Sequence, residues 1–211
     1  MITVSIDEKN AVEKTIGVIA SGGLAVLPTD TVYGIVGDAT KEHVILNLFL
    51  FKKRSKKKPF SIFVRDITMA RRYAYISDSK AKFLEKIWPG GIIALMHHKE
   101  KLPSVLTAGG DSIGIRIPDH PFLREILSHI DYPLIQTSAN FSGDTPACDG
   151  KDAKNYFQRL KIKPELIIDG GKTFRATSAV IDLTKEIPLI LRTGLMSKRE
   201  LDRMFERFYT T

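Results

Sequence analysis

The sequence predicts an α/β protein built around a mixed sheet, and three observations lead to this fold class. Short apolar runs rich in Val, Ile and Leu alternate with stretches whose apolar residues recur at helical spacing. The last apolar runs, from residue 166 onward, follow one another without a helical stretch between them, which favours a mixed sheet over a purely parallel one. The 211 residues are 43% hydrophobic, enough for one sizeable core, so we expect a single domain over residues 1–211.

Six stretches have the apolar periodicity and the end signals of α-helices. They begin at residues that accept backbone hydrogen bonds, or they end at glycine or proline. The expected helices are a first one that Asp7 caps and Gly22-Gly23 ends, a second that Thr40 caps, Ser79 to Trp88, Asp119 to Ile130 with Pro121 in its first turn, Asp152 to Leu160, and a last helix that opens with the capping box Ser197-x-x-Glu200 and carries Leu201, Met204, Phe205 and Phe208.

Eight short apolar runs are expected to form the strands. Most end at proline, glycine or a polar cluster, as strands that lead into loops do. The expected strands are Leu24 to Leu27, Ser61 to Val64, Ile92 to Met96, Ile113 to Ile117, Leu134 to Thr137, Leu166 to Ile168, Ser178 to Leu183 and Leu189 to Leu191.

Composition limits the class of partner and the compartment. The formal net charge is +8, which favours anionic partners such as a nucleotide, RNA or an acidic surface, although solubility alone is another reason for such a charge. Cys148 is the only cysteine, and the first residues lack the basic and apolar regions of a secretory signal. No apolar run is long enough to span a membrane. We therefore expect a cytoplasmic protein with no membrane segment.

Several familiar site motifs are absent or incomplete. No His-Glu-x-x-His, paired-cysteine or Gly-x-Gly-x-x-Gly motif occurs, and His97-His98 has no third ligand in sequence, so we predict no protein-held metal. The run Gly170-Gly171-Lys172-Thr173 imitates the end of a P-loop. Leu166 occupies the position of the first glycine, and a strand rather than a helix is expected to follow. A bound nucleotide would therefore need another kind of site.

Cations and hydroxyls gather where strands are expected to begin or end. The run from Lys52 to Pro59 holds six cations in seven residues, which suits phosphate binding or a solvated loop. Arg116 interrupts one apolar strand and Arg192 ends another, and a cation in such a place needs a carboxylate or a ligand anion. Polar turns follow two further strands, at Pro28 to Gly34 and at Thr137 to Asn140.

In this order along the chain, the polar motifs resemble those of the YrdC/TsaC family of threonylcarbamoyl-AMP synthases. The resemblance covers roughly residues 21–194 and depends on the succession of motifs, since none is specific alone. The motifs are Pro28-Thr29-Asp30-Thr31-Val32-Tyr33-Gly34, Lys52-x-Arg54, Trp88-Pro89-Gly90-Gly91, Thr107-Ala108-Gly109, Gly114-Ile115-Arg116-Ile117-Pro118-Asp119-His120-Pro121, Thr137-Ser138-Ala139-Asn140-Phe141-Ser142-Gly143, Ser178 to Leu183 and Leu191-Arg192-Thr193-Gly194.

The resemblance implies a fold and a reaction. The fold is a YrdC-like twisted sheet with flanking helices and a large basic cleft, and a chain of this length lacks the extra C-terminal domain of longer relatives. The reaction joins L-threonine, bicarbonate and ATP, with Mg²⁺ on the phosphates, into threonylcarbamoyl-AMP and pyrophosphate. Downstream threonylcarbamoyl-transferase proteins then modify an adenosine of tRNA, and tRNA itself is a further candidate partner.

The same resemblance assigns roles to individual residues. Lys52 and Arg54 become the catalytic cations, because charge that builds on the phosphates calls for preorganised positive groups. The implied ATP-binding residues are Lys52, Arg54, Ser138, Asn140, Ser178 and Arg192. The implied threonine-binding residues are Thr31, Tyr33, Thr107 and Arg116, with Arg116 as the partner of the carboxylate.

Two departures from the family pattern keep other functions open. Many members have a Pro-Leu-Ile-Val-His pattern where this chain has Pro59-Phe60-Ser61-Ile62-Phe63, so Phe63 replaces the histidine. YciO-type paralogues share a Phe-Ser pattern there. The Arg-Pro-Gly of the family is Arg192-Thr193-Gly194 here. A YciO-like paralogue with another acceptor, or a non-catalytic RNA-binding module that uses the same basic cleft, therefore stands beside the synthase.

Overall fold

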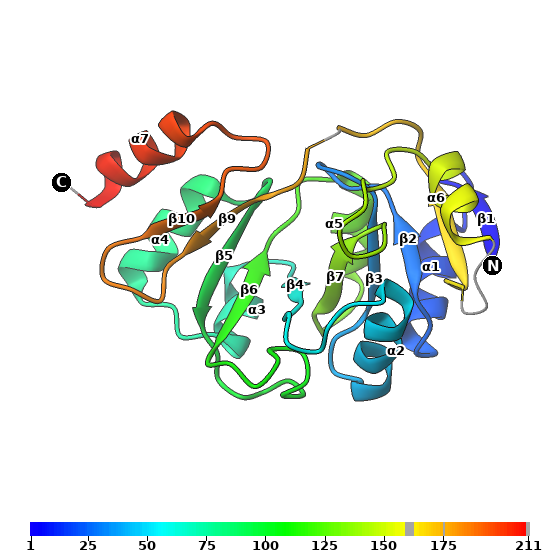
Figure 1. The fold of residues 1–211 in the computed structure, drawn as a ribbon, viewed down its shortest axis with the longest axis horizontal. Coiled ribbons are helices and arrows are strands. Elements are labelled where there is room, and N and C mark those ends of the chain that lie inside the picture. Colours follow the sequence, from blue (N-terminus) through cyan, green and yellow to red (C-terminus); the bar gives the residue numbers. More distant parts are fainter. Residues whose placement is uncertain (159–162, 175, 210–211) are drawn as a thin grey trace.

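A ten-stranded mixed sheet runs through the computed structural model, which describes residues 1–158, 163–174 and 176–209, with side chains up to residue 206. Its strand order is β1-β8-β2-β3-β7-β4-β6-β5-β9-β10, and it crosses the molecule from the N-terminal end to the C-terminal end (Figure 1). Both parallel and antiparallel pairs occur, so the predicted mixed sheet is confirmed. The strands are Ile2–Ser5 (β1), Ala25–Leu27 (β2), Gly34–Asp38 (β3), Ser61–Phe63 (β4), Ile92–His97 (β5), Ser112–Arg116 (β6), Leu134–Ser138 (β7), Leu166–Asp169 (β8), Ala179–Asp182 (β9) and Leu189–Arg192 (β10).

Seven helices flank the sheet in the described part of the chain. The capping box predicted for the last one is confirmed, because the Glu200 carboxylate accepts from the Ser197 backbone N–H at 2.7 Å and the Ser197 hydroxyl accepts from the Glu200 N–H at 3.3 Å. The helices are Ala11–Ala20 (α1), Glu42–Lys52 (α2), Ile67–Tyr73 (α3), Asp78–Ile87 (α4), Pro121–Ser128 (α5), Gly150–Phe157 (α6) and Lys198–Tyr209 (α7).

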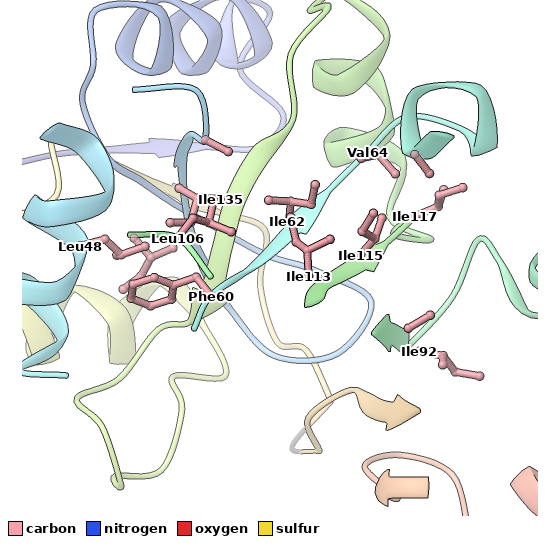
Figure 2. Packing of buried hydrophobic residues seen from close by; sticks show 14 of the residues in the cluster. Leu48, Phe60, Ile62, Val64, Ile92, Leu106, Ile113, Ile115, Ile117 and Ile135 are labelled. Atoms are coloured by element: carbon pink, nitrogen blue, oxygen red, sulfur yellow. The ribbon is translucent and has the colours of Figure 1, made fainter. Parts of the chain in front are cut away.

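Alternating side chains send the apolar residues of each strand to opposite faces of the sheet. One face is covered along most of its length by α2, α3, α4, α6 and α7, which share a single apolar cluster with the strands. Figure 2 shows part of this cluster, where Leu48 of α2 lies near Phe60, Leu106 and Ile135, and Ile62 lies near Ile113 and Ile115. This face is therefore closed core.

The opposite face is covered only in part. Helices α1 and α5 pack there through residues such as Ile19 and Leu123, in a cluster that spans β1, β8, β2 and β3 and reaches Leu134 of β7 and Phe63 of β4. Both helices pack against the sheet because their apolar residues recur three or four positions apart and so form one apolar side. Over β4, β6, β5 and β9 the same face carries residues that belong to neither apolar cluster, among them Ser61, Gly114 and Val180. This uncovered half of the sheet is the floor of the cleft described below.

Three predicted helix caps, at Asp7, Thr40 and Asp119, are wrong, and the last lies one residue before the observed capping position, His120. Asp7 lies in a turn, and α1 begins after Asn10, because the chain first forms β1 and needs this turn to reverse. Thr40 does not cap α2, because its hydroxyl and its N–H both bond to the Asp38 carboxylate, and Lys41 is the capping position.

The remaining predicted helices and strands are confirmed, with ends that differ by a few residues. Helix α4 is capped by Ser77, α5 by His120 in place of Asp119, and α6 by Asp149. The predicted end of α6 at Leu160 and the side chain of Phe208 lie outside the described residues. Gly170 to Thr173 leads into strand β9 rather than into a helix, as the rejection of a P-loop required.

Three elements were not predicted from the sequence. Strand β3 holds two glycines in five residues, which weakens its strand signal, and β1 buries only Val4 of its four residues. Helix α3 has seven residues, of which two are arginines. Its N-cap is nevertheless of a typical residue type, aspartate. The Asp66 carboxylate accepts from the Met69 N–H at 2.7 Å.

Candidate active site

The uncovered half of the sheet forms the floor of an open cleft of about 320 Å³. Floor residues lie in rows across strands β7, β4, β6 and β5, because paired residues of neighbouring strands point to the same side. The walls come from the segment after β2, the loop after α2 and the segments around β9 and β10. Charged, polar and aromatic side chains and one leucine are among the lining residues: Thr31, Tyr33, Arg54, Ser61, Phe63, Leu95, Arg116, Gln136, Ser138, Ser178 and Arg192.

Arg116, at the end of β6, is the most deeply buried cation of the cleft, with 1% of its surface exposed. Its Nη2 forms an ion pair with Asp30, and its Nε donates to the Gly90 carbonyl at 2.8 Å. Its Nη1 donates to Thr31 Oγ1 at 3.2 Å and to Ser178 Oγ at 2.5 Å. Burial lowers the pKa of this guanidinium, and the Asp30 charge opposes that shift. Four of its five N–H groups are therefore committed to protein partners.

These contacts determine whether the hydroxyls of Thr31 and Ser178 can donate a hydrogen bond to a ligand or accept one from it. Thr29 Oγ1 donates to the Val32 carbonyl at 2.7 Å, so the 2.9 Å contact between the Thr29 and Thr31 hydroxyls requires Thr31 to donate. Thr31 Oγ1 then keeps only an acceptor lone pair. Ser178 Oγ accepts from Arg116 and keeps its own proton. The two hydroxyls beside Arg116 thus present one acceptor and one donor, which suits the ammonium and carboxylate of an amino acid.

Arg54 and Arg192 form a second, separate cationic centre. Arg54 is held by the Lys58 carbonyl at 3.1 Å and the Pro59 carbonyl at 2.8 Å, and Arg192 by the Ser178 carbonyl at 2.9 Å. Burial lowers the pKa of both groups, and the Arg192 charge lowers the pKa of Arg54 further, so the two repel each other. Among the described residues neither pairs with a carboxylate, which is the arrangement that an anion would relieve.

Backbone geometry brings each of these arginines to the cleft. Helix α2 ends at Lys52, and the next residue, Lys53, has a left-handed φ of 47°. The Arg54 N–H then bonds to the Phe49 carbonyl at 3.0 Å, so the chain turns sharply toward the cleft. Gly194 has a φ of 62°, and a Cβ there would lie 2.3 Å from backbone atoms of Ser178 and Ala179. Only glycine allows the segment after β10 to lie this close to Ser178.

Lys52 does not line the cleft but supports one of its walls. Its side chain is buried, and Nζ donates to the Ser138 carbonyl and to Asn140 Oδ1, both at 2.6 Å. Asn140 Oδ1 also accepts from Ser138 Oγ at 2.7 Å, and its Nδ2 donates to the Asp144 carbonyl. Burial lowers the pKa of Lys52 to about 7, with a further contribution from the Arg54 charge, against which Asp144 acts. Lys52 and Asn140 thus shape the turn that places Ser138.

Tyr33 and Thr107 are also held by protein contacts. The Tyr33 hydroxyl donates to the Gly171 carbonyl at 2.8 Å and accepts from the Gly170 N–H at 3.0 Å, so it ties the loop after β8 to the cleft. Burial raises its pKa to about 12, which keeps it protonated. Thr107 is buried outside the cleft lining, and its hydroxyl donates to the Ser104 carbonyl at 3.2 Å.

The cleft thus brings together seven of the ten residues that the sequence singled out, and Lys52, Asn140 and Thr107 lie outside its lining. Sequence reasoning missed three residues. Asp30 lies inside a quoted motif, and the need of Arg116 for a carboxylate was the signal that could have found it. Gln136 and Ser61 lie on the floor; no sequence signal marked Gln136, whereas Ser61 belongs to the Phe-Ser pattern that the sequence shares with YciO-type paralogues. That the cleft is basic overall stays a prediction.

The described residues contain neither a metal site nor a helix that could span a membrane. No group of three or more His, Cys, Asp and Glu side chains is arranged to hold a metal ion within the described part of the chain. None of the helices described for this chain is long and apolar enough to cross a bilayer.

Comparisons with known proteins relate this cleft to one family. The Sua5/YciO/YrdC family model, described as telomere recombination, matches residues 17–194. The threonylcarbamoyl-AMP synthase of Pyrococcus abyssi is 31% identical over 191 residues, which cover 89% of this chain and 55% of that protein. The crystal structure of P. abyssi Sua5 complexed with L-threonine has a TM-score of 0.89 at 29% identity, covering 97% of this chain and 61% of that one. E. coli YciO, at 22% identity and a TM-score of 0.82, shares the fold over 93% of this chain and 95% of its own.

Proposed function

Since the chain belongs to the Sua5/YciO/YrdC family, we propose that it is an L-threonylcarbamoyladenylate synthase, a nucleotidyltransferase that serves tRNA modification in the cytoplasm. Its substrates are L-threonine, bicarbonate and ATP, and its products are threonylcarbamoyl-AMP and pyrophosphate. A partner transferase then passes the threonylcarbamoyl group to an adenosine of tRNA. The names of the P. abyssi relatives support this proposal, although this chain spans only 55% to 61% of their length.

One observation carries the proposal. A single cleft holds two different polar centres, the buried Arg116 with its oriented hydroxyls and the pair Arg54 and Arg192. The first centre suits a zwitterion and the second suits a polyphosphate. A binding module for RNA alone would need the cations but not the buried donor and acceptor beside Arg116.

The chemistry asks the protein mainly for positioning and charge. Bicarbonate and the threonine amine give an N-carboxylate and water. A carboxylate oxygen then attacks the α-phosphorus, a new P–O bond forms, and the bond to the bridging oxygen of the β-phosphate breaks to release pyrophosphate. Charge grows on the leaving oxygens, so Arg54 and Arg192 would stabilise the transition state from fixed positions.

The other site residues would act on the substrates or on the cleft walls. Arg116 would approach the threonine carboxylate with its remaining N–H, with Ser178 as a second donor. Thr31 would accept from the amine. Ser138 Oγ, which donates its own proton to Asn140, would accept a hydrogen bond from the nucleotide, while Lys52 holds its turn in place.

The residues of the cleft do not fit a magnesium site. None of the described side chains that line it carries a carboxylate, and Asp30 is committed to Arg116. Magnesium would therefore come to the cleft only as the companion of the ATP phosphates.

A direct assay tests the proposal. The protein is incubated with ATP, Mg²⁺, bicarbonate and L-threonine, and pyrophosphate and the adenylate are measured, the latter by mass spectrometry. We expect pyrophosphate that depends on both threonine and bicarbonate. Binding of RNA without pyrophosphate would favour the RNA-binding module, and pyrophosphate that forms equally well with other amino acids would favour a paralogue of YciO type.

A further inference from the structure

A polar pair lies in the middle of the cleft floor, between the two cationic centres. Gln136 of β7 and Ser61 of β4 are register partners, and Gln136 Nε2 donates to Ser61 Oγ. Both line the cleft, yet Gln136 is only 8% exposed. A carboxamide this deep in a sheet normally has all of its polar atoms paired.

This pair is only half satisfied by the protein. Ser61 Oγ accepts from Gln136 and keeps its own proton, while Gln136 Oε1 accepts no hydrogen bond from the described residues. If the carboxamide were turned over, Ser61 would donate to Oε1 and Nε2 would remain free. In either orientation the pair leaves at least one donor and at least one acceptor side by side. One ligand oxygen that both accepts and donates, which means a hydroxyl group, would satisfy both.

The surroundings of the pair are apolar and lead to Arg116. Gly114, the register partner of Ser61 on β6, has no side chain, and Leu95 lies beyond it on β5. A Cβ on Gly114 would lie 3.0 Å from Ile93 and 3.1 Å from Ser61 Cβ, so this part of the floor is closely packed. Arg116 is two residues further along β6, about 7 Å at the rise of a strand. That separation matches the size of one amino acid.

The neighbouring row of floor residues contains Phe63, which stands where many members of the family have a histidine. Phe63 is the register partner of Arg116 and lies under its guanidinium, 5.5 Å from the ring centre. A phenyl ring can neither donate to nor accept from a hydroxyl in the way an imidazole does. Recognition of a substrate hydroxyl in this chain therefore has to come from another residue of the floor.

We propose that Ser61 and Gln136 form the specificity pair of this chain, which binds the side-chain hydroxyl of the amino-acid substrate. The substrate would be a 3-hydroxy amino acid whose carboxylate lies at Arg116 and whose methyl group, in threonine, lies against the partly exposed Leu95. This inference rests on the proposed function and names the residues that select its amino acid. The pair positions and selects the substrate and takes no part in the bond changes.

Valine is the matched probe, because it replaces the hydroxyl of threonine with a methyl group of similar size. We compare kcat/KM for pyrophosphate formation with threonine and with valine in the wild type, in Ser61→Ala and in Gln136→Met. Each substitution should lower the threonine-to-valine ratio about tenfold or more, the scale of a lost hydrogen bond that leaves its partner unpaired. Because the quantity is a ratio, it does not depend on the fraction of variant that folds.

Two controls separate specificity from general damage. Ser128→Ala removes an exposed hydroxyl on α5 that bonds only within its own helix turn, and it should leave the ratio unchanged. Arg54→Ala should slow both amino acids alike and also leave the ratio unchanged. Calorimetric titration of threonine and valine, with ATP present, measures the same preference without turnover.

The outcomes distinguish this inference from the proposed function. Threonine-dependent pyrophosphate with an unchanged ratio in both variants overturns the specificity pair and leaves the synthase standing. A binding preference for threonine that Ser61→Ala abolishes, without any pyrophosphate, supports the pair and overturns the synthase. Altered discrimination between ATP and GTP, with an unchanged amino-acid ratio, would mean that the pair binds the base and would overturn the inference.

Discussion

At the scale of single residues, Arg116 shows how a buried cation is made tolerable. An isolated guanidinium at this depth would be strongly unfavourable, and Asp30, Gly90 and two hydroxyls compensate for its burial. Removing the cation leaves the Asp30 carboxylate without its partner. We therefore predict that Arg116→Met lowers the free energy of unfolding by about 3–5 kcal/mol, measured by urea denaturation.

The matched control for Arg116 is the exposed pair of Arg124 and Asp119, whose charged atoms lie 3.6 Å apart with more than half of each side chain exposed. Water and mobility reduce such a pair to about 0–1 kcal/mol. Arg124→Met should therefore change stability little. Equal losses in the two variants would show that the Asp30 pair has no special weight in this fold.

Lys52 should make stability depend on pH in a predictable direction. Burial lowers its pKa in the folded protein to about 7, well below the ordinary value for lysine. At pH values above about 7 the unfolded chain still binds the proton that the folded protein has lost, so unfolding takes up a proton and stability rises with pH. Below pH 7 both states hold the proton, and the full cost of burying the charge is felt.

The prediction is that the wild type gains up to about 1.4 kcal/mol per pH unit over Lys52→Met between about pH 7 and 10. Urea denaturation of both proteins across this range measures it. The comparison with methionine cancels other titrating groups, as long as they behave alike in both proteins. Parallel stability curves would mean that the pKa of Lys52 is not lowered on folding.

The residue types of the site could be predicted from the sequence, but the role of each residue in the site could not. Arg54 and Arg192 line the cleft as expected, whereas Lys52 donates to Ser138 and Asn140. Whether a cation points to a ligand or to a neighbouring carbonyl depends on contacts 86 and 88 residues apart, and no local pattern encodes these. The same holds for the pairing of Ser61 with Gln136, 75 residues away.

At the scale of elements, a single tyrosine connects the cleft to the loop after β8. Its hydroxyl is the only described side-chain partner of the Gly170 N–H and the Gly171 carbonyl. Tyr33→Phe would remove this partner from two exposed glycines, at a cost of about 0.5–1.5 kcal/mol for each hydrogen bond. We predict faster hydrogen exchange at Gly170 and at its neighbours in the loop, measured by mass spectrometry on short peptides.

The control for this loop is Tyr75→Phe, because Tyr75 is 64% exposed. It removes the same hydroxyl from a position far from the loop, so exchange at Gly170 should stay as in the wild type. Unchanged exchange in Tyr33→Phe would contradict the role of Tyr33 as the tie of this loop. Since its pKa is raised to about 12, the effect should persist across the neutral pH range.

Element prediction succeeded where the apolar pattern was strong and failed where a strand was mostly exposed or interrupted by glycine. Helix α5 was clear, because Phe122, Leu123, Ile126 and Leu127 all face the core. Strand β3 was missed, although all five of its residues are buried, because glycines give no apolar signal. Its place between β2 and β7 follows from pairing, which the sequence of one strand does not specify.

At the scale of the whole molecule, the cleft exists because helices cover the two faces of the sheet unequally. Five helices share the apolar cluster on one face, while α1 and α5 cover only the N-terminal part of the other. Floor residues on the uncovered part are then free to be small or polar, as Gly114, Ser61 and Gln136 are. The alternation of side chains along each strand predicts that the sheet has two faces. Which face stays open depends on the order of the strands, which the alternation does not specify.

The charge of the whole molecule gives the last prediction, which concerns ionic strength. The net charge of +8 and the unpaired Arg54 and Arg192 should attract ATP, and salt screens such attraction over about 10 Å at 0.1 M. The Kd for ATP, measured by calorimetry, should therefore rise as NaCl increases from about 0.05 to 0.5 M.

Arg54→Ala should raise the Kd about tenfold or more at low salt, the scale of one lost charged hydrogen bond, and flatten the salt dependence. Arg72→Ala removes an exposed arginine that pairs with Asp131 at 2.9 Å, and should change neither the Kd nor its slope by a comparable amount. A Kd that stays constant with salt, or that responds equally to both substitutions, would mean that overall charge rather than the pair at the cleft attracts the nucleotide.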